Sequence, residues 1–180
     1  MERLDTMLVH GTTTVEIKSG YGLNTEEELK ILEATKRINQ MHCINVVPTF
    51  MGAHAVPMEY KKNAEEYVDI ITQETVPKVV DSGLAEFCDV FCDRGMFNLE
   101  QTKRVLKCAT RLGLKQKIHA DHMSMLGGAE FAADIGAISA DHLNYSSAEG
   151  IKAMAKKCVT GLLLPAATFR MMTNRFPMQG

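Results

Sequence analysis

The sequence lacks C-x-x-C cysteine pairs and any excess of basic residues. Its five cysteines are an odd number, which favours reduced thiols over a disulfide framework. Twenty Lys and Arg residues stand against 22 Asp and Glu, a formal net charge of -2, so nothing suggests the clustered basic face of a nucleic-acid-binding protein. We therefore expect a cytoplasmic protein that binds no nucleic acid.

Long hydrophobic runs are also missing. The best candidate, Val159 to Phe169, is interrupted by Pro165 and is shorter than the ~20 residues that a membrane-spanning helix needs. The first residues, Met1 to Asp5, do not have the basic and then apolar order of a signal peptide. We expect no membrane partner.

What the sequence does have is a regular alternation of short, β-branched apolar runs with longer amphipathic stretches. This pattern is typical of repeated βα units around a parallel sheet. The expected strands are residues 12–18, 43–50, 86–92, 116–120, 137–142 and 160–164, and the expected helices are residues 2–9, 25–41, 60–82, 99–112, 128–135 and 147–157. No linker or block of charge separates them, so the sequence predicts one α/β domain over residues 1–180.

The number of units matters for the fold class. Six strands follow a leading helix that has no strand before it, and residues 170–180 show no further strand. A complete eight-unit barrel typically needs ~250 residues, and this chain has 180. We therefore expect an incomplete parallel (β/α) barrel of TIM type, with six of its eight βα units.

Residues able to do chemistry follow four of the six expected strands. In parallel α/β folds the functional groups gather at the carboxyl ends of the strands. We expect the side chains at these ends to meet at one rim: Tyr21, His54, His119, His122 and His142.

Each of these positions also has a purely structural interpretation. Residues 18–22 could be a flexible turn, and His54 a hydrogen-bonded loop histidine. His119 would share a strand face with Asp121, where an imidazole suits Zn²⁺ or Fe²⁺, although a buried histidine can equally be structural, and the same holds for His142.

Other features favour structural roles. Cys88 and Cys92 lie four apart on one strand face and are expected to be small core residues. Gly127 and Gly128 precede a short helix but lack the rest of a phosphate loop. Nothing in the sequence gives Asp89 a catalytic role.

At these strand ends the chain resembles the imidazolonepropionase family of the metal-dependent amidohydrolases. The resemblance runs from about Arg3 to Phe169 and covers less than half of a family member. Its matching segments are HGTTTVEIKSGYGL (10–23), PTFMGAHA (48–55), DVFC (89–92), IHAD (118–121), SADHL (139–143) and LLP (163–165).

The resemblance implies a barrel, with the strands of this chain corresponding to the second to seventh, that holds one Zn²⁺ or Fe²⁺. The metal would activate water to open the ring amide C–N bond of 4-imidazolone-5-propanoate, giving N-formimidoyl-L-glutamate in histidine degradation. His119 would be a metal ligand and His142 a catalytic residue in proton transfer or polarisation. Tyr21 and His54 would bind the substrate.

Two departures from the family pattern limit this interpretation. His122, also expected to contact the substrate, stands where the family usually has Glu or Gln. The family's His-x-His pair, its last-strand Asp and its upstream Arg for the substrate carboxylate are not in the chain. Since a catalytic metal normally has three protein ligands, we expect weak or no metal binding and little or no activity from these 180 residues alone.

Three interpretations therefore stay open. The first is an imidazolonepropionase-like hydrolase, and the second is a deaminase or another cyclic-amide hydrolase of the amidohydrolase superfamily. The third is a non-catalytic remnant. An open barrel exposes two sheet edges, which invite pairing with another chain, so we also expect a homo-oligomer.

Overall fold

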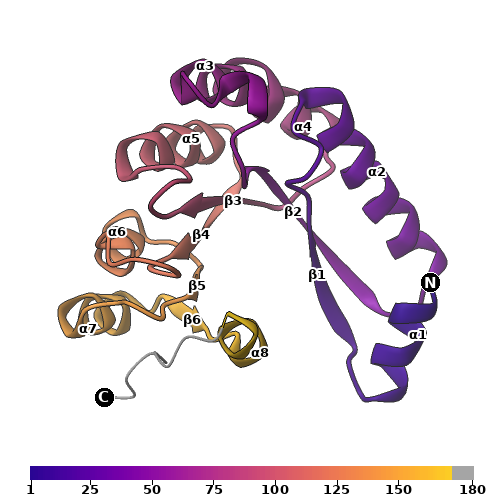
Figure 1. The fold of residues 1–180 in the computed structure, drawn as a ribbon. Helices are drawn as coiled ribbons and strands as arrows, with labels where there is room; N and C mark the ends of the chain where they lie inside the picture. The colour runs from indigo at the N-terminus through magenta and orange to yellow at the C-terminus, as the bar shows by residue number, and fades with distance from the viewer. Residues whose placement is uncertain (172–180) are drawn as a thin grey trace.

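A computed structural model describes residues 1–171 of the chain. It contains one sheet of six parallel strands whose spatial order follows the chain, from β1 to β6. The strands are β1 (Thr14–Lys18), β2 (Asn45–Ala53), β3 (Phe87–Cys92), β4 (Lys115–Ala120), β5 (Ser139–His142) and β6 (Thr160–Leu162). Figure 1 shows the sheet curled into an open arc with helices on its convex side, which is a half-barrel.

Most of the helices connect consecutive strands, whereas the first precedes β1 and the last follows β6. They are α1 (Glu2–Val9), α2 (Thr25–Met41), η1 (Met58–Tyr60), α3 (Ala64–Ile70), η2 (Ile71–Thr75), α4 (Val76–Ser82), α5 (Leu99–Arg111), α6 (Gly128–Ile135), α7 (Ala148–Lys157) and α8 (Pro165–Arg170). All six expected strands are present within a few residues of their expected bounds, so the predicted incomplete (β/α) barrel of TIM type is confirmed. The expectation for residues 172–180 lies outside the described part of the chain.

Local chemistry explains where the helices begin. The side chain of Asn24 accepts a hydrogen bond from the backbone N–H of Glu27, and the acidic residues 26–28 lie in the first turn of α2, where they favour the positive end of the helix dipole. Asn98 and Gln101 form a reciprocal capping box at the start of α5.

The helix expected over residues 60–82 is present from Ala64 to Ser82, so it starts four residues later than expected, and its middle is π-helical. The segment is divided into α3, a wider π-helical turn η2, and α4, with a separate 3-10 turn before them. Pro77 has no N–H to donate and its ring crowds the carbonyl four residues earlier. The backbone widens in the turn just before it. The short helix α8, after Pro165, was not predicted.

The hydrophobic core lies between the sheet and the helices, on the convex side. One cluster contains Phe50 and Val90 packed against residues of α3 to α5, and a second contains Ile118 and Ala140 packed against α6 and α7. Cys88 and Cys92 are fully buried, as expected, and burial raises the pKa of the Cys92 thiol to about 11. The residues that alternate with these core positions face the concave side, and there the sheet is polar.

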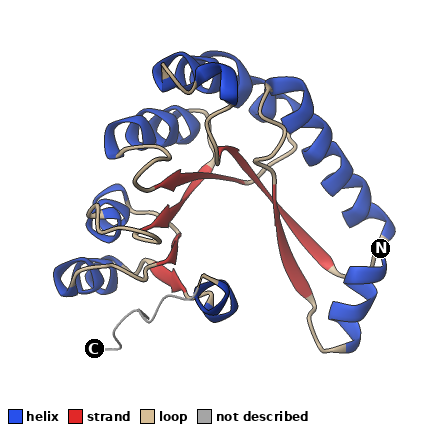
Figure 2. Cartoon of the chain, in the orientation of Figure 1, coloured by secondary structure: helices blue, strands red, loops and turns tan. Residues whose placement is uncertain are grey.

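In Figure 2 most of the helices lie outside the arc that the strands form. Within residues 1–171, none of them is long and apolar enough to cross a membrane.

Candidate active site at the carboxyl ends of the strands

The expected rim residues lie together around one phenylalanine. The ring centroid of Phe91, on β3, lies 5.6 Å from that of His54, 5.6 Å from that of His119 and 5.8 Å from that of His122. These histidines come from the loop after β2, from β4 and from the loop after β4. Their contacts around Phe91 make a single aromatic surface at the strand ends.

Two further contacts extend this surface on either side. His142 stacks on His122 with ring centroids 3.6 Å apart and an interplanar angle of 11°, and it also lies 5.1 Å from His119. At the opposite end, the exposed Tyr21 ring tilts over His54 at a centroid distance of 4.6 Å. The structure thus brings together all five residues singled out from the sequence.

The loop that carries Tyr21 is fixed rather than loose. Gly20 has a φ of +124°, and a Cβ there would lie 2.8 Å from the carbonyl oxygen of Met51 and 2.9 Å from the Cβ of His54. The buried carboxylate of Glu28, on α2, accepts hydrogen bonds from the backbone N–H groups of Gly20 and Gly22, at 3.1 and 2.6 Å. These contacts argue against the flexible-turn interpretation of residues 18–22.

An irregularity in β2 accompanies the placement of His54. The pairing of β2 with β3 changes register between Phe50 and Ala53, and such a bulge re-aims the side chains that follow it. The Tyr67 hydroxyl donates to the carbonyl of Gly52 at 3.1 Å and anchors this distortion to the outer helices. His54 follows directly after it.

His142 and Leu143 have an unusual backbone. Their φ angles are +77° and +61°, the left-handed region that non-glycine residues rarely adopt. Such strain is characteristic of functional sites, and here it follows β5 at the point where the His142 ring turns onto His122.

The expectation that His119 and Asp121 share a face was wrong. Asp121 has a φ of +48° and lies beyond the end of β4, so the strand alternation does not reach it. Its buried carboxylate accepts backbone hydrogen bonds from Leu126, Gly128 and Ala129, each at 3.0 Å, and one from the Ser146 hydroxyl. Asp121 therefore anchors the start of α6.

Below the rim, a charged group joins three strands. Lys18 Nζ lies 2.6 Å from Asp89 Oδ2 and 2.7 Å from Asp141 Oδ2. Nδ1 of His119 is 3.1 Å from the Asp89 carboxylate. Asp89, His119 and Asp141 each offer one ligand atom within 4.8 Å of the others, so these three could hold a cation.

Sequence reasoning missed Lys18, Asp89 and Asp141 as members of the site. A usable signal existed, because all three occupy concave-face positions of their strands. Asp89 alternates with the core residues Cys88 and Val90, as Asp141 does with Ala140.

The charges of this group are strongly coupled. Burial acts against the charge of Asp89, but His119 and Lys18 outweigh it and hold the pKa of Asp89 well below its usual range. Burial likewise acts against the ammonium of Lys18, and the two carboxylates nevertheless raise its pKa. Asp89 and Lys18 are therefore ionised at neutral pH.

For three of the rim histidines, in contrast, no opposite charge outweighs burial, and their pKa values are lowered. Burial, together with the neighbouring His119, lowers the pKa of His54 and of His122. For His142, burial and the nearby His122, His119 and Lys18 lower the pKa to about 3. Near pH 7 these three imidazoles are neutral and can accept or donate hydrogen bonds.

Several of their ring nitrogens are buried without a hydrogen-bond partner among residues 1–171. They are Nδ1 of His54, both nitrogens of His122 and Nδ1 of His142. Because buried polar atoms are nearly always bonded in folded proteins, these nitrogens mark the rim as a place for a polar ligand.

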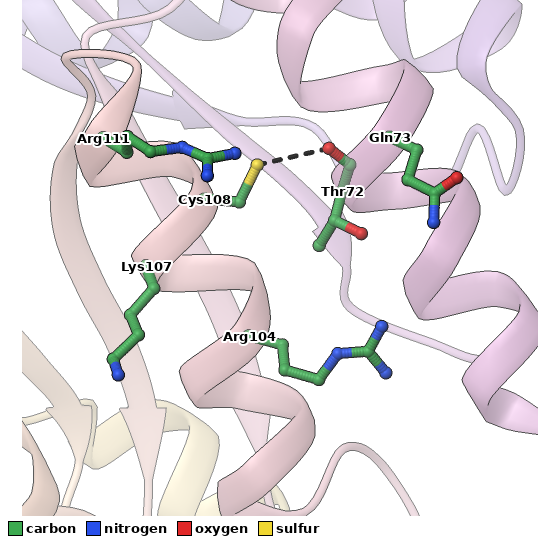
Figure 3. A pocket seen from close by; sticks show the side chains of 6 residues that line it. All are labelled: Thr72, Gln73, Arg104, Lys107, Cys108 and Arg111. Atoms are coloured by element: carbon green, nitrogen blue, oxygen red, sulfur yellow. Dashed lines mark hydrogen bonds between the residues drawn. The ribbon is translucent and has the colours of Figure 1, made fainter.

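A separate cavity of about 560 Å³ lies on the outside of the barrel, between η2 and α5. It is lined by Thr72, Gln73, Arg104, Lys107, Cys108 and Arg111 (Figure 3). No residue of the rim reaches it, so it is not part of the candidate active site.

Comparison with known proteins finds close relatives of this chain in sequence. The chain is 54% identical over 173 residues to the imidazolonepropionase of Alkaliphilus metalliredigens, with 96% of this chain covered. It is 51% identical over 169 residues to that of Thermoanaerobacter pseudethanolicus and 53% identical over 172 residues to that of Geobacillus sp.. The chain is homologous to a segment of the imidazolonepropionases. It spans about 41% of the length of these imidazolonepropionases.

Solved structures agree on the fold alone. The chain superposes on guanine deaminase from C. acetobutylicum with a TM-score of 0.67 at 16% identity, covering 98% of this chain and 45% of that one. For a Xaa-Pro dipeptidase the TM-score is 0.60 at 15% identity, covering 92% and 46%. This chain therefore covers less than half of each of these two proteins. No protein-family model matches the chain.

Proposed function

We propose that this chain forms the central part of an imidazolonepropionase that opens the ring amide C–N bond of 4-imidazolone-5-propanoate to give N-formimidoyl-L-glutamate. The observation that carries the proposal is the rim itself. It holds four imidazoles, and the rings of His54 and His122, which have buried nitrogens without partners, both lie against Phe91. A flat, polar heterocycle can both stack on such a surface and hydrogen-bond to it.

The proposed cofactor is one Zn²⁺ or Fe²⁺, with His119 as one of its ligands. His119 fits that role because its Nδ1 faces Asp89, while Nε2 has no hydrogen-bond partner among residues 1–171. Histidine ligands usually donate their second ring N–H to a carboxylate in this way. A divalent metal bound there would lower the pKa of a water molecule to near neutrality. We propose that the remaining ligands come from outside these 180 residues.

Each side chain of the rim would then have its own role in the reaction. His142, neutral and close to His119, would accept a proton from the attacking water and pass it to the ring nitrogen that leaves. His54 would hydrogen-bond the carbonyl oxygen as negative charge develops there. His122 and the Tyr21 hydroxyl would contact the substrate at its edges.

The edges of the sheet suggest where other strands pair. β1 and β6 are the outermost strands within residues 1–171, each with a neighbour on one side only. We propose that these edges pair with further strands, either from a longer chain or from a second copy in a homo-oligomer, and that the protein works in the cytoplasm. Solution scattering of the 180-residue chain would show a monodisperse monomer if the edges stay unpaired.

A segment exchange tests the proposed function. The 173-residue matching stretch of this chain would replace the homologous segment of the Alkaliphilus metalliredigens imidazolonepropionase, which supplies the flanking parts. The expected result is turnover of imidazolone propionate with one metal ion per chain, and loss of both in the same hybrid carrying His119→Gln. A folded hybrid that retains its metal but shows no turnover, even with His122→Glu, would refute the function.

A further inference from the structure

The part of the site with no role so far is the charged group below the rim. The side chain of Asp89 is completely buried and that of Asp141 is 4% exposed. Two carboxylates this close in a buried place need a cation between them. In this chain the cation is the ammonium of Lys18, which bonds both.

Within residues 1–171, one group of His, Cys, Asp and Glu side chains could jointly hold an ion, namely Asp89, His119 and Asp141. The Lys18 ammonium already lies against the two carboxylates of this group. Lys18 Nζ lies 2.6 Å from Asp89 Oδ2 and 2.7 Å from Asp141 Oδ2. An ion bound here would need the same two carboxylate oxygens as ligands. A metal cannot enter without displacing the lysine.

The same contacts define how His119 is used. The Asp89 carboxylate already accepts a hydrogen bond from the Lys18 ammonium at 2.6 Å, and a carboxylate can only accept hydrogen bonds. It therefore requires a proton on Nδ1 of His119, 3.1 Å away. In a neutral imidazole the lone pair is then on Nε2.

We propose that Lys18 serves as a built-in cation that keeps metal ions out of the Asp89–Asp141 pair, and that Asp89 is a positioning residue that holds His119 in its Nδ1–H tautomer. In this arrangement the pair binds no metal, and Nε2 is the single nitrogen that His119 offers. The inference depends on the proposed function only in assigning that nitrogen to a catalytic metal.

The first experiment removes the internal cation. The metal-free 180-residue chain, its Lys18→Met variant and a matched Lys117→Met control are titrated with Zn²⁺ by calorimetry. Lys117 is also a concave-face lysine, but it bonds Glu16 rather than the aspartates. We expect Lys18→Met to gain one Zn²⁺ site at least about tenfold tighter than any in the parent, and Lys117→Met to gain none. The double variant Lys18→Met, Asp141→Asn should lose the new site.

Two results of this titration would overturn the proposal. One is a Zn²⁺ site in the unmodified chain that Asp141→Asn abolishes, because the lysine would then exclude nothing. The other is a folded Lys18→Met variant, judged by circular dichroism, that gains no site.

The second experiment is read first on the unmodified chain. Long-range ¹H–¹⁵N correlation spectra of the histidine rings report which nitrogen carries the proton. In the unmodified chain His119 should be the Nδ1–H tautomer, and in Asp89→Leu it should shift toward the Nε2–H form. A His119 protonated on Nε2 in the unmodified chain contradicts the positioning role. Neither experiment depends on turnover, so a failure of the proposed function would leave both results interpretable.

Discussion

His122 and His142 stack face to face with ring centroids 3.6 Å apart. Both rings have buried nitrogens that find no partner in residues 1–171, and both pKa values are lowered, chiefly by burial. The pair therefore remains neutral near pH 7.

Replacing His122 with Glu should improve catalysis in the hybrid enzyme. A carboxylate there can accept two hydrogen bonds from the substrate ring and would stabilise positive charge on His142. We expect kcat/KM to rise by about tenfold, the equivalent of one charge-assisted hydrogen bond. The control is His10→Glu, at the exposed end of α1. An unchanged or lower kcat/KM in His122→Glu would show that the histidine is suited to this chain.

Acid should destabilise the chain through the rim histidines. Unfolding gives His142 its ordinary pKa of 6.5, whereas the folded value is about 3. The unfolded state therefore binds more protons, and stability is lost progressively as the pH falls from about 6.5 toward 3. In metal-free buffer we expect a loss of about 1 kcal/mol between pH 7.5 and 5, after allowing for solvent screening.

Urea unfolding at several pH values measures this effect. His142→Gln should flatten the dependence, and His10→Gln should leave it unchanged. Equal slopes in all three proteins would mean that His142 is not the group responsible.

The carboxylate of Glu28 should control the order of the Tyr21 loop. Glu28→Ala leaves the N–H groups of Gly20 and Gly22 without their acceptor, which should cost about 2 kcal/mol of unfolding free energy. Glu28→Gln keeps an amide oxygen and should cost less. Glu27→Ala, on the exposed side of α2, should change stability by under about 0.5 kcal/mol. Hydrogen exchange at residues 20–22 should accelerate in Glu28→Ala alone, and unchanged exchange would contradict the role.

Asp121 should be more important for stability than any rim histidine. Asp121→Ala removes the acceptor for three backbone N–H groups around the start of α6 and for the Ser146 hydroxyl. We expect a loss of about 3 kcal/mol or more. Asp134→Ala, an exposed change on the same helix, is the matched control. A similar small effect in both variants, measured by thermal unfolding, would argue against the anchor.

The sequence predicted the units well because their signals are local. Apolar runs and caps such as Asn24 and Asn98 act within a few residues. These local signals were enough to predict the strands and most of the helices. The five rim residues were found because parallel strands end at one edge. Their individual roles remain predictions.

The Lys18–Asp89–Asp141 group escaped notice because nothing local links its members. Lys18 and Asp141 are 123 positions apart in the chain, and they meet only when the sheet curls. The left-handed backbone of Asp121 likewise depends on surroundings that no local pattern carries.

The sheet order from β1 to β6 has a consequence for how the molecule forms. Since every strand pairs with the strand next in sequence, each unit can dock as soon as it leaves the ribosome, onto a neighbour already in place. Contacts between residues that are close in sequence favour rapid folding. Synthesis from the N-terminus would supply the units in their final order. The charged group is complete only when Asp141 is in place with β5. Until then Lys18 and Asp89 lack their third partner.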